Sequence, residues 1–211
     1  MITAFGSHWV SPNGASGAGK TADGATREWE FPFFSGSAET SCRPWTRRAR
    51  RVHVIGGPGS GKTWLAARLG AALRCPIYAL DMWPDIATIS LEPTWVAEGV
   101  FLWGIAPLLE RADVIVMLDL PYRVAARRIV TRHIWLSTLG RNRHRGLRLL
   151  ARFAWGARRY YWAQYGRPPD GPTDWDALSR AQTNVVLGPF GDKVVRLHRR
   201  RQVVHWLRAL G

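Results

Sequence analysis

Residues 52–63 read Val-His-Val-Ile-Gly-Gly-Pro-Gly-Ser-Gly-Lys-Thr, an apolar run that leads directly into a glycine-rich loop. The loop satisfies the pattern G-x-x-x-x-G-K-[ST], in which backbone N–H groups and the start of the next helix bind phosphate. A strand before the loop and an apolar helix start at residues 64–69 give the context that such a loop needs. The predicted nucleotide-binding residues are Gly56, Gly57, Pro58, Gly59, Ser60, Gly61, Lys62, Thr63 and Trp64.

Two side chains of this loop have predicted chemical roles. Lys62 is expected to reach the β- and γ-phosphates and to act in catalysis, and the Thr63 hydroxyl is expected to ligate Mg²⁺. Residues 14–21 match the same pattern, but Pro12 and Asn13 precede them instead of a strand, and residues 22–25 are a poor helix start. We therefore predict that only the second loop binds nucleotide.

Length and composition favour one globular domain with an appendage. The chain has 211 residues, 46% of them hydrophobic, and no apolar run long enough to span a membrane. Residues 1–46 are rich in Gly, Ser, Ala and Pro, and we expect a disordered or flexible extension before a domain at 47–211. Cys42 and Cys75 lie far apart in unlike contexts, which favours a reducing, cytoplasmic setting. The oligomeric state is not indicated.

A net charge of +15 favours polyanionic partners. Only three of the 30 basic residues are lysines, and arginine forks suit bidentate contacts with phosphate. Eleven arginines and no acidic residue lie between Pro121 and Tyr161. This segment is expected to contact either nucleotide phosphates or nucleic acid, with the basic cluster at 141–148 as a second phosphate-facing or nucleic-acid contact. The aromatic stripe at 153–162 is expected to be packing more than a platform for bases.

Strands and helices alternate from residue 51 onward, which is typical of a parallel α/β sheet. Five strands are predicted at 52–55, 77–80, 94–97, 113–118 and 193–197, with helices at 61–73, 104–111 and 199–210. Asp81, Glu98 and Asp119 each follow an apolar strand. Because ligands bind at the carboxyl edge of such sheets, these acids are expected to share the edge with the phosphate loop.

The ordered set of motifs resembles the adenylate-kinase-like P-loop family, and most closely its group of DNA topology modulation proteins. The resemblance covers about residues 51–210 and uses the loop, residues 76–83 around Asp81, residues 95–99 around Glu98, residues 110–121 and the arginine-rich segment. It implies a three-layer P-loop NTPase fold with a five-stranded parallel sheet and an arginine-rich helical lid at 121–175. One departure is Val100, where relatives often have a polar residue.

The resemblance also implies roles for individual residues. Asp81 lies where related small kinases contact the acceptor, although an acid here also suits a helix cap. Glu98 is expected to hold a metal-bound water beside Thr63, and Asp119 is expected to be structural. Arg127 and Arg128, followed by Arg132, are expected to close over the transferring phosphates. His198 and Arg199 are expected to line the pocket for the adenine base.

Two functions follow from these residues. The first is an ATP- and Mg²⁺-dependent kinase that transfers the γ-phosphoryl group to a small nucleotide-like or metabolite acceptor. The second is a nucleic-acid-associated nucleotide-binding protein or ATPase that engages DNA through its basic segment. A nucleotide-binding protein without turnover stays open as a third. The sequence does not name the acceptor.

Overall fold

The computed structural model describes residues 49–82, 85–140, 146–164, 167–171 and 174–209. The predicted flexible extension, the upstream loop pattern at 14–21 and residues 141–145 of the basic cluster lie outside these described residues. The boundary of the predicted domain at residue 47 also lies outside them and stays a prediction.

Five parallel strands form one sheet in the order β2-β3-β1-β4-β5. They are β1 (Arg51–Gly56), β2 (Ile77–Ala79), β3 (Trp95–Gly99), β4 (Val114–Leu118) and β5 (Val194–Leu197). The strand that leads into the phosphate loop lies at the centre, with Ile55 level with Gly99 on one side and Met117 on the other. The predicted five-stranded parallel sheet is confirmed.

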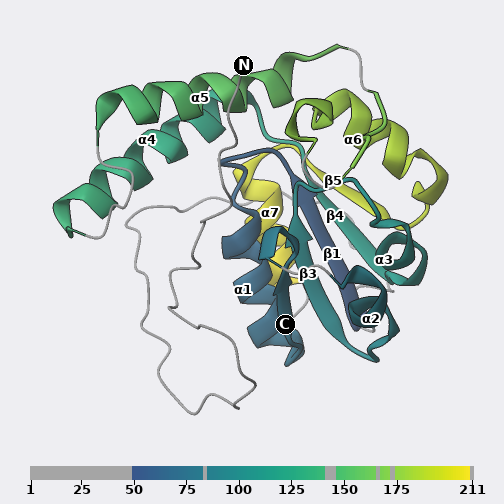
Figure 1. Ribbon diagram of the computed structural model, residues 1–211. Coiled ribbons are helices and arrows are strands. Elements are labelled where there is room, and N and C mark those ends of the chain that lie inside the picture. Colours follow the sequence, from purple (N-terminus) through teal and green to yellow (C-terminus); the bar gives the residue numbers. More distant parts are fainter. Residues whose placement is uncertain (1–48, 83–84, 141–145, 165–166, 172–173, 210–211) are drawn as a thin grey trace. The chain divides into compact units, whose positions relative to one another are not determined.

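Seven α-helices are described between and after the strands (Figure 1). They are α1 (Lys62–Leu73), α2 (Ile86–Leu91), α3 (Ala106–Arg111), α4 (Tyr122–Thr138), α5 (Leu147–Trp162), α6 (Arg180–Leu187) and α7 (Arg200–Arg208). Short 3₁₀ turns lie at η2 (Leu80–Met82), η3 (Trp175–Ala177) and η4 (Gly188–Phe190). Among the described residues, no helix combines the length and the apolar character that crossing a bilayer requires.

The sequence analysis did not predict α2 and α6, which have only six and eight residues. Both begin at a capping side chain that accepts a backbone N–H: Asp85 from Thr88, and Ser179 from Gln182, each at 3.0 Å. Such a cap satisfies one of the helix's orphan donors. These capping residues were the local signal for the two helices.

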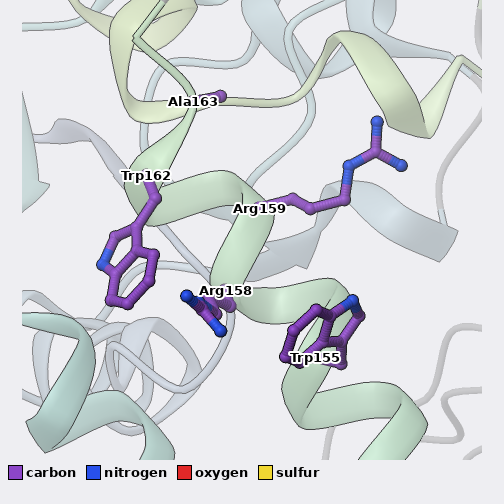
Figure 2. A pocket seen from close by; sticks show the side chains of 5 residues that line it. All are labelled: Trp155, Arg158, Arg159, Trp162 and Ala163. Atoms are coloured by element: carbon purple, nitrogen blue, oxygen red, sulfur yellow. The ribbon is translucent and has the colours of Figure 1, made fainter.

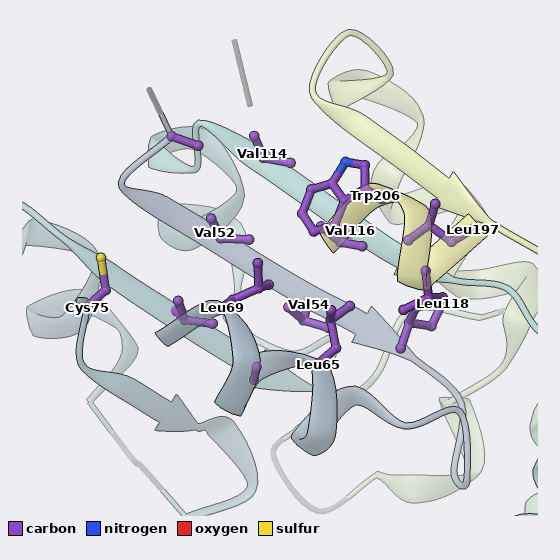
Figure 3. Close-up of a cluster of buried hydrophobic side chains, with 14 residues drawn as sticks. Val52, Val54, Leu65, Leu69, Cys75, Val114, Val116, Leu118, Leu197 and Trp206 are labelled. Carbon is purple, nitrogen blue, oxygen red and sulfur yellow. The ribbon is translucent and has the colours of Figure 1, made fainter. Parts of the chain in front are cut away.

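Alternate side chains of the strands point to opposite faces of the sheet, and each face packs on helices. Figure 3 shows the first face, where Val52 and Val54 of β1 meet Leu65 and Leu69 of α1. Helix α7 completes this layer with Val203 and Trp206. Period-two alternation along β1 thus places its even-numbered residues on the α1 and α7 side.

The second face packs on α2, α3 and α6. Ile55 of β1 and Ile115 and Met117 of β4 lie in a cluster with Leu108 of α3 and Leu187 of α6. Since helices cover both faces, the fold has three layers, as predicted.

The arginine-rich segment forms an antiparallel helix pair, α4 and α5, beside the sheet (Figure 1). Its base is a small apolar cluster of Val100, Ala125, Tyr160 and Tyr161. Val100, the departure from the family pattern, is 8% exposed and packs in this cluster. Its apolar side chain therefore supports the helix pair.

His53 is a polar residue at the centre of β1 and is fully buried. Burial lowers the pKa of its imidazole from 6.5 to about 4, and the backbone of Ala97 offsets only part of this effect. The unfolded chain therefore binds this proton more tightly than the folded protein does. The resulting stability is complete above pH 6.5 and is lost as the pH falls toward 4.

We expect the free energy of unfolding to fall as the pH is lowered from 7 to 4.5. His53 should account for on the order of 2 to 3 kcal/mol of this decrease. Urea unfolding of wild type and of His53→Leu at both values measures this contribution as the difference between their pH dependences. Equal pH dependence in wild type and His53→Leu would contradict the assignment.

Candidate functional site

The loop between β1 and α1 has the backbone form of a phosphate cradle. Gly59 and Gly61 have φ values of 75° and 94°, in the left-handed region that favours glycine. Helix α1 begins at Lys62 with no side-chain cap and no acidic residue in its first turn. The N–H groups of that turn have no acceptor earlier in the helix, so they are available to an anion.

The loop lies against the base of α4 and α5. A Cβ added to Gly57 would lie 2.4 Å from Cδ1 of Tyr160, and one added to Gly59 would lie 2.7 Å from the carbonyl oxygen of Ala125. Alanine therefore does not fit at either position without displacing its neighbour. The helix pair forms a wall directly against the cradle.

Lys62 and Thr63 come together with two of the three predicted acids, Glu98 and Asp81, at the carboxyl edge of the sheet. The Thr63 hydroxyl donates to Oε1 of Glu98 at 2.9 Å, and the Lys62 ammonium donates to the Gly57 carbonyl at 3.3 Å. Lys62 also interacts electrostatically with both Glu98 and Asp81. Glu98 ends β3, and Asp81 lies in the 3₁₀ turn that follows β2.

Burial sets the electrostatics of this group. It lowers the pKa of the Lys62 ammonium, against the opposing charges of Glu98 and Asp81. It raises the pKa of Glu98, which is 7% exposed, against Lys62 and the Thr63 hydrogen bond. Partial desolvation also raises the pKa of Asp81, although that side chain still reaches solvent. A partly desolvated cation beside two carboxyls of raised pKa is typical of functional sites.

The three predicted arginines of α4 do not share one environment. Arg128 is half-buried and donates to the carbonyl oxygen of Ser60 in the loop. Arg132 interacts electrostatically with Glu98. Arg127 is exposed, and helical geometry places it about 200° around α4 from buried Ala125. The structure thus brings Arg128 and Arg132 to the loop and leaves Arg127 on the far side of the helix.

Asp119 has two ion-pair partners, and its structural role stays a prediction. Its carboxylate lies 2.9 Å from Nε of Arg180 and 3.3 Å from Nδ1 of His198. His198 follows β5, and Arg199 is the N-cap of α7, where both backbone N–H groups donate to Gln202. These residues lie on the β4–β5 side of the sheet edge, so their predicted base contacts stay a proposal.

Trp64 projects outward from the first turn of α1. Its ring is 42% exposed and lies 5.7 Å from the Arg68 guanidinium carbon. Its contribution to the cradle would therefore come from its backbone N–H.

Tyr161 and Arg180 contact this region without having been predicted. The Tyr161 hydroxyl donates to the Pro58 carbonyl at 2.9 Å, and Arg180 lies over the Tyr161 ring at 5.2 Å. Tyr160 and Tyr161 are buried, as expected of packing residues. The aromatic stripe at 153–162 predicted packing in general. No local pattern in the sequence shows which tyrosine hydroxyl reaches the loop.

The other part of the stripe lines a groove on α5. Trp155 and Trp162 are 66% and 57% exposed, and the groove between them has a volume of about 290 Å³. Figure 2 shows Arg158 between the two indoles, with its guanidinium carbon 4.7 Å from the Trp155 centroid and 3.7 Å from that of Trp162. Arg159 is instead paired with Asp176 at 2.8 Å. These two tryptophans are not core residues, unlike Tyr160 and Tyr161.

No protein-family model matches this chain. No curated protein matches it in sequence. The resemblance to the DNA topology modulation group therefore stays a prediction.

Three of the solved structures to which this chain shows similarity are kinases. A gluconokinase from Sinorhizobium meliloti is 17% identical, with 76% of this chain and 93% of that chain covered and a TM-score of 0.41. A shikimate kinase from Bacteroides thetaiotaomicron is 14% identical, with 77% and 96% of the two chains covered and a TM-score of 0.40. A deoxyadenosine kinase from M. mycoides with bound dATP is 12% identical, with 75% and 98% covered and a TM-score of 0.38. The likeness is distant, and the function proposed below rests on the geometry of the site.

We expect Lys62→Ala to weaken MgATP binding at least about tenfold, because the variant leaves the loop intact and removes its half-buried cation. Isothermal titration with MgATP measures the change. Lys20→Ala, at the equivalent position of the upstream pattern, is the matched control and should bind like wild type. A comparable loss in Lys20→Ala would contradict the prediction that one loop binds nucleotide.

Proposed function

We propose that this chain is an ATP-dependent phosphotransferase with a small-molecule acceptor. The observation that carries the proposal is the group of Lys62, Thr63, Glu98 and Asp81 at one sheet edge, directly beside a glycine loop of left-handed backbone. Phosphoryl transfer needs positioned phosphates and neutralised charge more than covalent chemistry from the protein. The loop and Lys62 meet both needs.

The donors at this edge suit a nucleotide phosphate. The Ser60 hydroxyl is buried and has no hydrogen-bond partner among the described residues, as would suit a donor that binds a phosphate oxygen. The amides of the loop and of the first turn of α1 would bind the remaining oxygens. Lys62 would contact the β- and γ-phosphates.

The same edge suits Mg²⁺ held mainly by the nucleotide. Thr63 and Glu98 offer the hard oxygen atoms that Mg²⁺ prefers. In the described part of the chain, no group of three His, Cys, Asp or Glu side chains converges on one point, so phosphate oxygens and water would complete the coordination. When bound, the metal would neutralise charge on the transferring phosphate.

Asp81 is the candidate for contact with the acceptor. It lies after β2, beyond β3 from the loop, and its carboxyl reaches solvent while interacting with Lys62. Its raised pKa suits a group that accepts a proton from an acceptor hydroxyl. Arg132, which interacts with Glu98, is placed to add positive charge above the phosphates.

We expect substitution of Glu98 and substitution of Asp81 to impair different steps of the reaction. Glu98→Gln should lower Mg²⁺-dependent turnover with every acceptor, by about 10- to 1000-fold, because the metal site loses its carboxylate. Asp81→Asn should lower transfer to the acceptor by about 100-fold or more and leave the Kd of MgATP near that of wild type. A coupled ADP assay over nucleosides, nucleotides and sugars, with calorimetry for the Kd, measures both. Full transfer activity in Asp81→Asn would contradict the proposal that Asp81 contacts the acceptor.

The Trp155–Trp162 groove favours a second candidate, a nucleotide-binding protein that engages single-stranded nucleic acid. Exposed indoles beside an arginine suit stacked bases and their phosphates. The segment around the groove carries eleven arginines and no acidic residue between Pro121 and Tyr161, which complements a polyanion. The strand-edge acids are not used by this function, which is why we place it second.

If nucleic acid binds here, Trp155→Ala and Trp162→Ala should each weaken binding of a labelled oligo-dT by about 5- to 100-fold, because each removes one stacking surface. Trp103→Ala is the control, since Trp103 is 44% exposed and lies outside α5. Fluorescence anisotropy at fixed salt measures the affinities, because a +15 chain binds any polyanion to some extent. Unchanged affinity in both Trp155→Ala and Trp162→Ala would exclude the groove as the binding site for nucleic acid. Strong stimulation of ATP turnover by DNA, with no small acceptor found, would favour this function over the kinase.

A further inference from the structure

Two carbonyl groups of the phosphate loop accept hydrogen bonds from the helix pair. The Tyr161 hydroxyl of α5 donates to the Pro58 carbonyl at 2.9 Å, and the Arg128 guanidinium of α4 donates to the Ser60 carbonyl. Lys62, at the start of α1, donates to the Gly57 carbonyl of the same loop. The loop is therefore held from outside at two alternate peptide groups.

Because the peptide bonds are trans, each of these two hydrogen bonds also fixes the direction of the N–H group of the next residue. The carbonyl of one residue and the N–H of the next point in opposite directions, and the described residues contain no cis peptide bond. Holding the Pro58 carbonyl toward α5 turns the Gly59 N–H away from it, and holding the Ser60 carbonyl toward α4 does the same for Gly61. Neither N–H donates to an acceptor within the described part of the chain.

We infer that Tyr161 and Arg128 are positioning residues that aim the Gly59 and Gly61 amides into the phosphate cradle. The inference rests on the proposed nucleotide site and deepens it. It also assigns Arg128 a role different from the expected one, because the family resemblance implied a contact with the transferring phosphate, whereas its guanidinium here bonds the loop backbone.

The Tyr161 ring is held firmly enough to serve this purpose. It is 6% exposed and packs edge-on against Tyr160 at a centroid distance of 5.2 Å. Arg180 covers the ring and is itself fixed by Asp119 and by the Leu120 carbonyl, each at 2.9 Å. Burial also raises the pKa of the Tyr161 phenol, so the hydroxyl stays a donor at neutral pH.

The chain offers a matched pair of variants for the test. Tyr161→Phe removes the donor to Pro58 and keeps the ring. Tyr160→Phe removes a hydroxyl that is equally buried but bonds to Thr183 at 3.1 Å instead of to the loop. We expect Tyr161→Phe to raise the Kd of both ADP and ATP about tenfold and Tyr160→Phe to leave both near wild type, with similar losses of thermal stability in the two variants. Calorimetry on the full-length chain gives the Kd values.

Arg128→Met tests the second contact by itself and decides the matter if Tyr161→Phe does not fold. Loop amides bind the phosphates that ADP and ATP share, so a positioning role predicts an equal rise in Kd for the two nucleotides. A clamp on the γ-phosphate alone predicts a rise for ATP only. Arg123→Met, an exposed arginine of the same helix, is the control.

Three results would overturn the inference: unchanged Kd values in Tyr161→Phe, equal rises in Tyr161→Phe and Tyr160→Phe, or a rise confined to ATP in Arg128→Met. Absence of ATP and ADP binding in the wild type would instead remove the proposed function itself. The two failures are therefore distinguishable.

Discussion

A phosphate cradle made of backbone depends on keeping its amide groups unpaired and correctly turned. In this protein the Gly57 carbonyl accepts a hydrogen bond from the Ser60 N–H within the loop, whereas the Pro58 and Ser60 carbonyls accept from donors further along the chain. Tyr161 and Arg128 are these donors. The central place of β1 in the sheet, the close approach of the helix pair at Gly57 and the apolar cluster around Val100 all serve to hold the loop and those donors together.

The site brings a positively charged side chain and two carboxyl groups close together in a strongly basic chain. A chain of net charge +15 has a surplus of cations, yet the carboxyls of Glu98 and Asp81 interact with Lys62, the half-buried cation of the loop. Glu98 and Asp81 partly offset the cost of burying that ammonium, and Lys62 does the same for them. The acid-free helix pair carries the excess positive charge, which suits a bound polyphosphate more than the protein's own acids.

The sequence predicted the loop, the five parallel strands and the placement of Glu98 and Asp81 with Lys62, because short motifs and apolar runs encode them locally. The third strand-end acid, Asp119, pairs with Arg180 and His198 instead. The sequence did not distinguish Arg127 from Arg128: both fit the helical spacing, and only the burial of Ala125 shows which side of α4 faces the loop. It missed Tyr161 entirely. That hydrogen bond joins residues 103 positions apart, and no local pattern records such a partner.

The same separation bears on the order in which the molecule acquires its parts. The loop's outer contacts come from residues 68 and 103 positions further along the chain, and its flanking strands pair only after long crossovers. Contacts of this kind form late, because the chain between them must first be ordered. A nascent chain on the ribosome therefore exposes the glycine motif long before α5 emerges. The contacts that orient the loop are therefore completed near the end of folding, so a ligand of the loop would stabilise the finished domain and not its early intermediates.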